Sequence, residues 1–501
     1  MSYNPNPVQT APQTEPNSQA APTISYNTNP IIIGLDIGTT KIAAIAGRKN
    51  EFGKLDLLGF GESESGGVSH GVVMNIEQCI ASIELAISRC LESNSELDIS
   101  EVYVGIAGQH IKSLQTRGDR VRVNVEEEIS KADIDQLIAD QGKTYIPAGD
   151  RIIDIIPQEF TVDSTTAVLD PIGMSGVKIG ANSHVITGDR NAIRNIRRCV
   201  EKSNLVTKDL VLQPLASAAA VMTDEDLEAG VAIVDIGGGT TDMAVFCDGM
   251  LKHTAVIPYA GVNVTEDIRK GLGVLRTHAE ALKTEYGTAL SDEASARDVI
   301  EIPGLRGLPP KEVSVKTLAH IIQARMEEIL DYVVYHLKQL DLDKKLYGGI
   351  ILTGGGSQLN HLVQLTAYKT GLPTRIGYPS EHISGDYASK MKNPKYATCV
   401  GLILRGYHDW ESGRLRFLNE TYQHRTPWES EEAWLAAGMK GLPADTPLDR
   451  AEALGEEGGE PQTFVQLPVE TKQRGEKLRK LFDNMKEKLM RLFEEDTDQE
   501  L

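Results

Sequence analysis

Several features that would place this chain in a specialised class are missing from its sequence. It has five cysteines, at 79, 90, 199, 247 and 399, an odd number without a C-x-x-C pair. This excludes the usual cysteine pattern of a zinc site or a disulfide framework. No apolar run approaches the ~18 residues that a membrane-spanning helix needs. No basic stretch precedes an apolar core at the N-terminus, so we expect no signal peptide. We expect the cysteines to be reduced thiols of a cytosolic protein.

Positive charge is also scarce. The chain has 51 Lys and Arg against 71 Asp and Glu, a net charge of −20. Nucleic-acid binding requires a basic field, so we expect no nucleic-acid partner. A content of 41% apolar and 24% charged residues is typical of a soluble globular protein. Since 501 residues exceed one ordinary core, we expect two or more domains.

The chain is unevenly organised. Residues 1–30 are rich in Pro, Asn, Gln, Ser and Thr with a single charge, Glu15, and are predicted to be a disordered tail. From residue 31, strand-like runs alternate with amphipathic helices such as 76–92 and 317–340, which indicates an α/β protein. Residues 411–470 are predicted to be a flexible linker because their pattern fades into Gly, Pro and Glu.

Two similar stretches carry the strongest signal. They are "IIIGLDIGTTKIAAI" (31–45) and "VAIVDIGGGTTDMAVF" (231–246). Each predicts a strand ending in Asp, a Gly-Thr turn and a returning strand. Glycines let backbone N–H groups approach an anion closely. Thr39, Thr40, Thr240 and Thr241 can add hydroxyl donors, and Lys41 a positive charge. Either stretch alone is equally explained as a glycine-rich strand turn.

The two acids suggest a cation. Asp36 and Asp235 would repel a bare phosphate, whereas Mg²⁺ bridges carboxylates to phosphates. The repetition therefore predicts two related halves that grip one nucleotide. A third turn, "GGIILTGGGSQLN" (348–360), predicts a strand, three glycines and a helix capped by Ser357. Such open backbone can pack against a flat ring and sugar.

The order of these motifs resembles a known superfamily. "DIGTTK", "QPLASAAAV" (213–221), "DIGGGTTD", "TGGGS" and "YATCVGLIL" (396–404) are similar, in that order, to the first phosphate loop, first connecting helix, second phosphate loop, adenosine loop and second connecting helix of actin-like ATPases. The segments "IIPQEFTVD" (155–163), "DPIGMSGVKI" (170–179), "VIPYAGVNVTEDI" (256–268) and "HAEALKTEYGTAL" (278–290) resemble the bacterial cell-division FtsA family. The resemblance runs from about 31 to 408.

This resemblance implies an α/β, actin-like fold of two related halves around a nucleotide cleft, with an FtsA-type inserted subdomain. The implied first-half core is 31–98, continuing at 179–222 and about 386–410, with the insert at 99–178. The second-half core is 223–270, continuing at 335–385, with an outer subdomain at 271–334.

The resemblance also implies roles for single residues. Asp36 and Asp235 would hold Mg²⁺ through water. The phosphates of ATP would be cradled by Gly38, Thr39, Thr40, Lys41, Gly237, Gly238, Gly239 and Thr240. Adenosine would contact Gly354, Gly355 and Gly356, with Glu280 and Lys283 near the ribose. As an i,i+3 pair, Glu280 and Lys283 are also explained as a surface ion pair.

Catalysis is left open. Gln213 stands where the superfamily places the side chain that orients the attacking water. Because a neutral amide is a weaker base than a carboxylate, we expect at most slow ATP hydrolysis.

The C-terminal region differs from the rest. Residues 472–493 contain eight Lys or Arg and three acids, within a predicted helix at 471–495. Its apolar residues follow one stripe: Leu478, Leu481, Phe482, Met485, Leu489, Leu492 and Phe493. Its cationic flanks include Lys477, Arg479, Lys480, Lys488 and Arg491. This pattern predicts an amphipathic helix on anionic membrane lipid. A helix docked on its own domain and a coiled coil are the alternatives.

The family resemblance implies a peripheral protein on the cytoplasmic face of the inner membrane at the division septum. It would form filaments, tether the tubulin-like protein FtsZ and recruit later division proteins. The C-terminal peptide of FtsZ would dock on 271–334, where Arg306, Lys311 and Arg325 are candidate contacts. For any one of them, ordinary solvated charge is the better explanation.

Two other functions remain. A soluble sugar or small-acid kinase of the same superfamily would need a catalytic carboxylate and an acceptor pocket, but no membrane helix. A peptide-binding chaperone would need a separate β-rich domain, which 411–470 does not supply.

Overall fold

The computed structural model describes residues 29–413, apart from 95–96, 305–308 and 343. All described residues belong to one unit, Met1–His424. Nearly all of the predicted tail 1–30, most of the linker 411–470 and the whole helix 471–495 therefore lie outside the described residues. In the part that is described, no helix is both long and apolar enough to cross a membrane.

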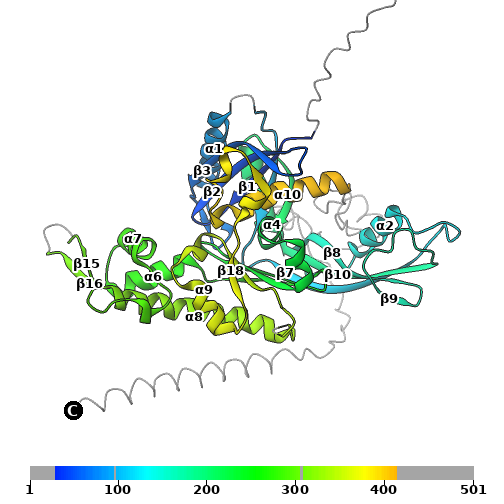
Figure 1. Cartoon of the computed structure of the whole chain (residues 1–501). Coiled ribbons are helices and arrows are strands. Elements are labelled where there is room, and N and C mark those ends of the chain that lie inside the picture. Colours follow the sequence, from blue (N-terminus) through cyan, green and yellow to red (C-terminus); the bar gives the residue numbers. More distant parts are fainter. Residues whose placement is uncertain (1–28, 95–96, 305–308, 343, 414–501) are drawn as a thin grey trace, which may run out of the picture. The chain divides into compact units, whose positions relative to one another are not determined.

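The first half is built on a six-stranded sheet in the order β11-β6-β1-β2-β3-β19. Figure 1 labels β1, β2 and β3 of this sheet. The strands are β1 (Ile32–Ile37), β2 (Lys41–Lys49), β3 (Leu55–Glu64), β6 (Glu101–Ile106), β11 (Val206–Leu212) and β19 (Ile383–Ser384). All six residues of β1 are buried. A strand covered on both faces requires this continuous apolar run, rather than alternation. A short hairpin, β4 (Val68–Ser69) and β5 (Val72–Val73), follows β3.

Helices cover both faces of this sheet. One layer contains α1 (Ile76–Ser93) and α3 (Arg190–Lys202), and the other contains α4 (Gln213–Val221) and α10 (Ala397–Ser412). Asn75 caps α1 by accepting the N–H of Gln78. α4 and α10 cross so closely that a Cβ at Gly401 would lie 1.7 Å from the carbonyl oxygen of Ala216. Only glycine fits at this crossing.

The second half repeats the arrangement with a five-stranded sheet in the order β14-β13-β12-β17-β18. The strands are β12 (Val231–Ile236), β13 (Thr241–Cys247), β14 (Met250–Ile257), β17 (Gly349–Thr353) and β18 (Thr374–Ile376). In each half a central strand pairs antiparallel with the next strand and parallel with a later one: β1 with β2 and β6, and β12 with β13 and β17. This repetition is the structural counterpart of the repeated sequence motif.

The remaining elements of the second half are mostly helical. They are α5 (Asp224–Ala229), α6 (Gly261–Leu272), α7 (Arg276–Tyr286), α8 (Val315–Gln339), α9 (Leu362–Thr370) and the hairpin of β15 (Val299–Ile302) and β16 (Lys311–Ser314). The predicted helices at 76–92 and 317–340 are confirmed as α1 and α8. The buried side chains of α1 are Cys79, Ser82, Ile83, Ala86 and Cys90.

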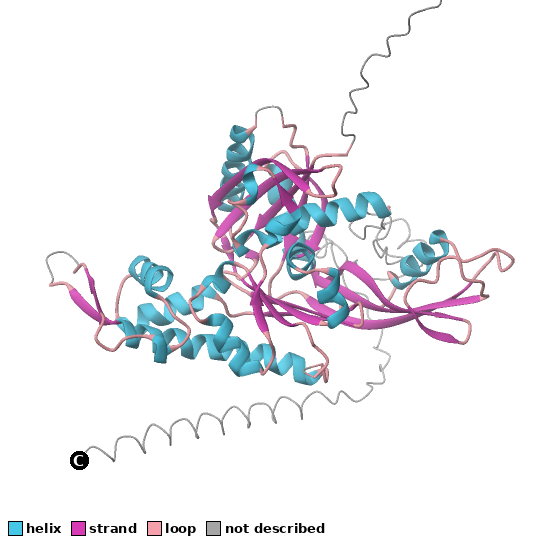
Figure 2. Cartoon of the chain, in the orientation of Figure 1, coloured by secondary structure: helices cyan, strands magenta, loops and turns pink. Residues whose placement is uncertain are grey.

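The insert is a four-stranded antiparallel sheet with α2 (Lys131–Gln141) on one face, and Figure 2 shows these strands in magenta. The strands are β7 (Lys112–Val121), β10 (Lys178–Asp189), β8 (Asp150–Val162) and β9 (Thr165–Val168), in the order β7-β10-β8-β9. The insert therefore begins and ends later than the expected 99–178. β6 pairs with β1 in the first-half sheet, whereas all of β10 pairs with β7 and β8.

Candidate functional site

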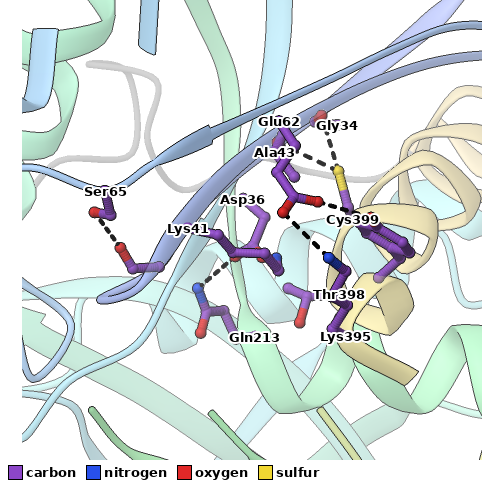
Figure 3. Close-up of polar contacts among 12 residues, drawn as sticks. Gly34, Asp36, Lys41, Ala43, Glu62, Ser65, Gln213, Lys395, Thr398 and Cys399 are labelled. Carbon is purple, nitrogen blue, oxygen red and sulfur yellow. Dashed lines mark hydrogen bonds and ion pairs between the residues drawn. The ribbon is translucent and has the colours of Figure 1, made fainter. Parts of the chain in front are cut away.

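The first glycine turn joins β1 to β2. The N–H of Gly38 donates to the carbonyl of Lys41 at 3.0 Å, which closes the turn. The hydroxyl of Ser65 donates to the carbonyl of Gly38 at 2.7 Å (Figure 3). The turn is thus fixed by its own backbone and by the residue that follows β3.

The second glycine turn joins β12 to β13 and is closed in the same way. The N–H of Gly237 donates to the carbonyl of Thr240 at 2.9 Å. The first N–H groups of α6, from Gly261 and Val262, donate to the carbonyls of Gly237 and Gly238 at 3.1 and 2.8 Å. Thr241 was expected to offer its hydroxyl to an anion. In the structure that hydroxyl donates to the carbonyl of Tyr259 instead.

The two turns face each other at close range. A Cβ at Gly238 would lie 2.4 Å from Cγ2 of Thr40, and one at Gly239 would lie 2.4 Å from Oγ1 of Thr39. Real side chains do not approach this closely, so the glycines are required for the turns to meet. The fold therefore brings together two stretches whose aspartates, Asp36 and Asp235, are 199 residues apart in the sequence.

The third glycine turn lies against the end of β12. Gly354 has φ +80°, and a Cβ there would lie 2.2 Å from Oδ1 of Asp235. The predicted cap by Ser357 is wrong: Ser357 lies inside a 3₁₀ turn, Gly355–Gln358, and its hydroxyl donates to the carbonyl of Gly354 at 2.8 Å. The next α-helix begins only at Leu362.

A cleft of about 610 Å³ lies between these turns. It is lined by every residue predicted for the nucleotide and its metal: Asp36, Gly38, Thr39, Thr40, Lys41, Gln213, Asp235, Gly237, Gly238, Gly239, Thr240, Glu280, Lys283, Gly354, Gly355 and Gly356. The sequence analysis did not identify seven further polar residues that also line it: Glu62, Asp242, Thr284, Gln358, Asn360, Lys395 and Thr398.

Asp36 is held from two sides. Nζ of Lys41 lies 2.6 Å from its Oδ2, and Nε2 of Gln213 donates to its Oδ1 at 3.0 Å (Figure 3). Burial would lower the pKa of Lys41, but the charge of Asp36 and the hydrogen bond to it raise that pKa overall. The ammonium group therefore stays charged, and the amide of Gln213 is fixed at the carboxylate.

Asp235 is held by the two crossing helices. Its Oδ2 accepts from Ser217 of α4 and, at 3.2 Å, from Thr398 of α10. Burial raises the pKa of Asp235 to about 6, and the negative charge of Asp36 adds to the rise. The carboxylate thus connects the second glycine turn to both helices that cross between the halves.

Asp242 is the most informative residue that the sequence analysis missed. It lies opposite Asp235 in the β12–β13 register, and Oγ1 of Thr240 donates to its Oδ2 at 2.8 Å. Its Oδ1 is buried and has no hydrogen-bond partner in the described structure. Burial and the charge of Asp235 raise the pKa of Asp242 to about 8. Pairing Asp235 with the second acid of "DIGGGTTD" across the expected hairpin would have identified it.

These carboxylates fit a divalent cation. Asp36, Asp235 and Asp242 all line one cleft, and one buried oxygen has no donor. No three Asp, Glu, His or Cys side chains within the described ranges are arranged to ligate a metal directly. Mg²⁺ commonly keeps several of its waters and bridges carboxylates to phosphates. The carboxylates of the cleft would hold such an ion through its waters.

Glu280 and Lys283 form the ion pair that their i,i+3 spacing suggests, whereas their expected place near a ribose stays a prediction. They form an ion pair at 2.8 Å, and both line the cleft. Nζ of Lys283 also donates to the carbonyl of Gly261 at 3.1 Å and to Oγ1 of Thr265 at 2.9 Å. The pair thus connects α7 to the start of α6, beside the second glycine turn.

Glu62 and Lys395 join β3 to the third glycine turn. Nζ of Lys395 lies 3.1 Å from Glu62, and the hydroxyl of Tyr396 donates to the same carboxylate at 2.7 Å. Burial would raise the pKa of Glu62, but these two hydrogen bonds lower it overall. The carbonyl of Pro394 accepts the N–H of Gly354 at 3.3 Å. No local pattern reveals contacts between residues so distant in sequence.

The two candidate peptide contacts that the structure describes, Lys311 and Arg325, each have partners within the protein. Arg306 and the predicted membrane residues lie outside the described residues. Lys311 donates to the carbonyl of Leu272. Arg325 makes ion pairs with Asp267 and Glu328, both at 2.5 Å, and lies over the ring of Tyr259.

Comparison with known proteins agrees with this architecture. The family model "Cell division protein FtsA" matches residues 232–401, and "SHS2 domain inserted in FTSA" matches 108–187. The cell division protein FtsA of Pseudomonas aeruginosa is 37% identical over 389 residues, which cover 78% of this chain and 92% of that protein. That of Escherichia coli is 35% identical over 385 residues, covering 75% and 90%.

A solved structure titled "PilM-PilN type IV pilus biogenesis complex" matches with a TM-score of 0.56 at 16% identity, covering 75% of this chain and 98% of that one. At this identity the likeness concerns the fold alone. Together with the match of the insert, it confirms the predicted actin-like α/β fold with an FtsA-type inserted subdomain. The extent and identity of the matched relatives lead to one assignment: this chain belongs to the FtsA family of cell division proteins.

Proposed function

We propose that this cell division protein binds ATP with Mg²⁺ and self-associates into actin-like filaments. In this proposal it tethers FtsZ to the cytoplasmic face of the inner membrane at the division septum and recruits later division proteins there. The observation that carries the ATP part is the meeting of two glycine turns, each preceded by a buried aspartate, around one cleft. The tethering and recruitment parts rest on membership of the FtsA family.

The residues of the cleft have distinct tasks in this proposal. Backbone N–H groups of both turns, with Thr39, Thr40 and Thr240, bind the phosphates. Asp36 and Asp235 hold the hydrated Mg²⁺, which neutralises phosphate charge when bound. Because the phosphates contact turns from both halves, nucleotide binding favours the closed cleft.

The crossing helices couple the cleft to the rest of the fold. Asp235 accepts hydrogen bonds from both α4 and α10, which are in close contact at Ala216 and Gly401. A change in the position or charge of Asp235 therefore alters its hydrogen bonds to both helices that connect the halves. We propose that this coupling makes self-association depend on nucleotide.

ATP hydrolysis is proposed to be slow. The amide N–H of Gln213 donates to Asp36. A neutral amide is also a weak base toward a water molecule. ATP then acts mainly as a ligand that stabilises one conformation, rather than as fuel for rapid turnover.

Membrane attachment is assigned to residues 472–493. Their eight cations offset the repulsion expected between an acidic protein and anionic lipid. One such helix binds reversibly, whereas a filament that presents many of them binds by avidity. FtsZ peptide binding is assigned to the outer subdomain. There Arg306 and Lys311 are the stronger candidates, because Arg325 already has two carboxylate partners.

Co-sedimentation with anionic liposomes tests this function. The full chain is compared with a chain ending at Val469, each with and without Mg-ATP, and FtsZ is then added. We expect only the full chain to pellet, more strongly with Mg-ATP, and to bring FtsZ with it. Alanine at Arg306, Lys311 and Arg325 together should reduce FtsZ in the pellet without reducing the protein itself. If both chains stay in solution under every condition, a soluble kinase becomes the better hypothesis.

A further inference from the structure

Helix α3 presents an unusually basic surface for so acidic a protein. Its inner side is buried through Ala192, Ile193, Ile196, Cys199 and Val200. Its outer side carries Arg194, Arg197, Arg198 and Lys202, which we call the α3 basic face, together with one acid, Glu201. Arg194 lies three residues before Arg197 and four before Arg198, and Lys202 lies four after Arg198, so the cations share one side of the helix.

The cations of the α3 basic face are poorly neutralised. Among the residues that the structure describes, Arg198 and Lys202 have no carboxylate partner, and Arg194 donates only to the side chain of Asn191 at 2.8 Å. Arg197 lies 3.9 Å from Glu201, at the limit of an ion pair. By contrast, Arg120 and Arg325 on other elements are each held by carboxylates. A row of cations with so little carboxylate pairing, in a chain of net charge −20, indicates an acidic partner.

The neighbouring helix argues for a narrow partner. α1 packs beside α3 on the same face of the sheet, and its outer residues include the exposed acids Glu77, Glu84 and Glu92. A broad acidic protein surface resting on α3 would approach these acids as well and be repelled. A single extended acidic chain could follow α3 without meeting them.

The spacing specifies that chain further. Arg194, Arg198 and Lys202 follow one another at intervals of four residues, or ~6 Å along the helix axis. In an extended chain, side chains on one side recur every second residue, at ~6.6 Å. Long Arg and Lys side chains absorb the small difference. The matching ligand therefore has acids at alternate positions, and this chain has that pattern at its own end, in Asp496-Thr-Asp498-Gln-Glu500.

We propose that the α3 basic face of one copy binds the acidic end, residues 496–500, of a second copy. The choice of a second copy rests on the proposed self-association, because an assembly holds many chain ends at high effective concentration near each α3. Each exposed ion pair is weak and salt-sensitive. The contact therefore reinforces an assembly that already exists and has little effect on isolated molecules.

Zero-length carbodiimide cross-linking tests this contact, because Lys202 is the one amine of the α3 basic face. Equal amounts of unlabelled and ¹⁵N-labelled full chain are assembled with Mg-ATP, cross-linked and analysed by mass spectrometry. We expect Lys202 joined to Asp496, Asp498 or Glu500 in peptide pairs of mixed label. The yield should fall at least fivefold in 0.5 M salt and in the double variant R194E/R198E.

Charge exchange distinguishes a specific contact from a damaged helix. Adding D496K/D498K to R194E/R198E should restore the link between Lys202 and Glu500. The matched control K338E/K344E, which reverses two exposed cations at the end of α8 and in the segment after it, should keep the wild-type yield. Retained binding of Mg-ATP shows that each variant is folded.

Several results would overturn the proposal. These are assembly without any mixed-label link from Lys202, links only within one label, or a yield that R194E/R198E leaves unchanged. Loss of binding to anionic liposomes in R194E/R198E with the link intact would make α3 a lipid contact instead. If the protein does not assemble but concentrated samples still give the mixed-label link, the copy-to-copy contact stands and the proposed filament function fails.

Discussion

Replacing Gly239 by alanine is expected to raise the Kd for Mg-ATP by roughly 10- to 100-fold. The added Cβ would lie 2.4 Å from Oγ1 of Thr39 and 2.9 Å from the backbone Cα of His70. The threonine side chain can rotate away, but the backbone of His70, in the turn between β4 and β5, cannot, so the second glycine turn must shift away from that hairpin and from Thr39. Isothermal titration of the variant with Mg-ATP measures this loss.

The control separates a local effect from a general loss of stability. Gly371 also resists a side chain, because its φ is +71°, but it does not line the cleft. Gly371→Ala should lower the melting temperature while leaving the Kd for Mg-ATP within about twofold of the wild-type value. An unchanged Kd in Gly239→Ala would show that the turns need not meet to bind the nucleotide.

Replacing Asp242 by asparagine is expected to stabilise the nucleotide-free protein and to weaken its binding of Mg-ATP. The wild-type carboxylate is buried beside Asp235 and has one oxygen without a donor, an arrangement that costs stability. An amide keeps the hydrogen bond from Thr240 and removes the charge. We expect a rise in melting temperature of roughly 1–3 °C and a Kd for Mg-ATP at least about fivefold higher.

The effect of pH on this variant has a definite sign. The folded-state pKa of Asp242 is about 8, above its ordinary value of 3.8. Stability from this carboxyl group is therefore present below 3.8 and is lost as the pH rises through about 8. The advantage of Asp242→Asn should grow from pH 5 to pH 8.5. Asp248→Asn, an exposed acid just after the same strand, should show no such trend. A lower melting temperature for Asp242→Asn would contradict this account.

The glycine turns could be predicted because their information is local. Each turn is encoded by adjacent residues, a strand ending in Asp followed by Gly and Thr, and the repetition of the motif indicated that the turns act together. All the residues that the sequence analysis predicted for the nucleotide site line one cleft. Whether these residues bind ATP stays a prediction that the titrations test.

Other features were hidden because they depend on tertiary contacts. The insert began later than expected since β6 looks like any other strand until its pairing with β1 is known. The contact between Glu62 and Lys395 spans 333 residues and has no local pattern. Arg325 looked available for a partner until Asp267, on α6, was placed beside it. Charge alone does not show which cations a fold has already neutralised.

The central claim is that one Mg-ATP binds between the two glycine turns, and titration calorimetry tests it directly. The account predicts one ATP per chain, binding that requires Mg²⁺, and a loss of at least about tenfold in affinity when either Asp36 or Asp235 is replaced by alanine. Because these residues come from different halves, equal dependence on both is the decisive result. Tight binding that survives either replacement, or that needs only one half, would contradict it.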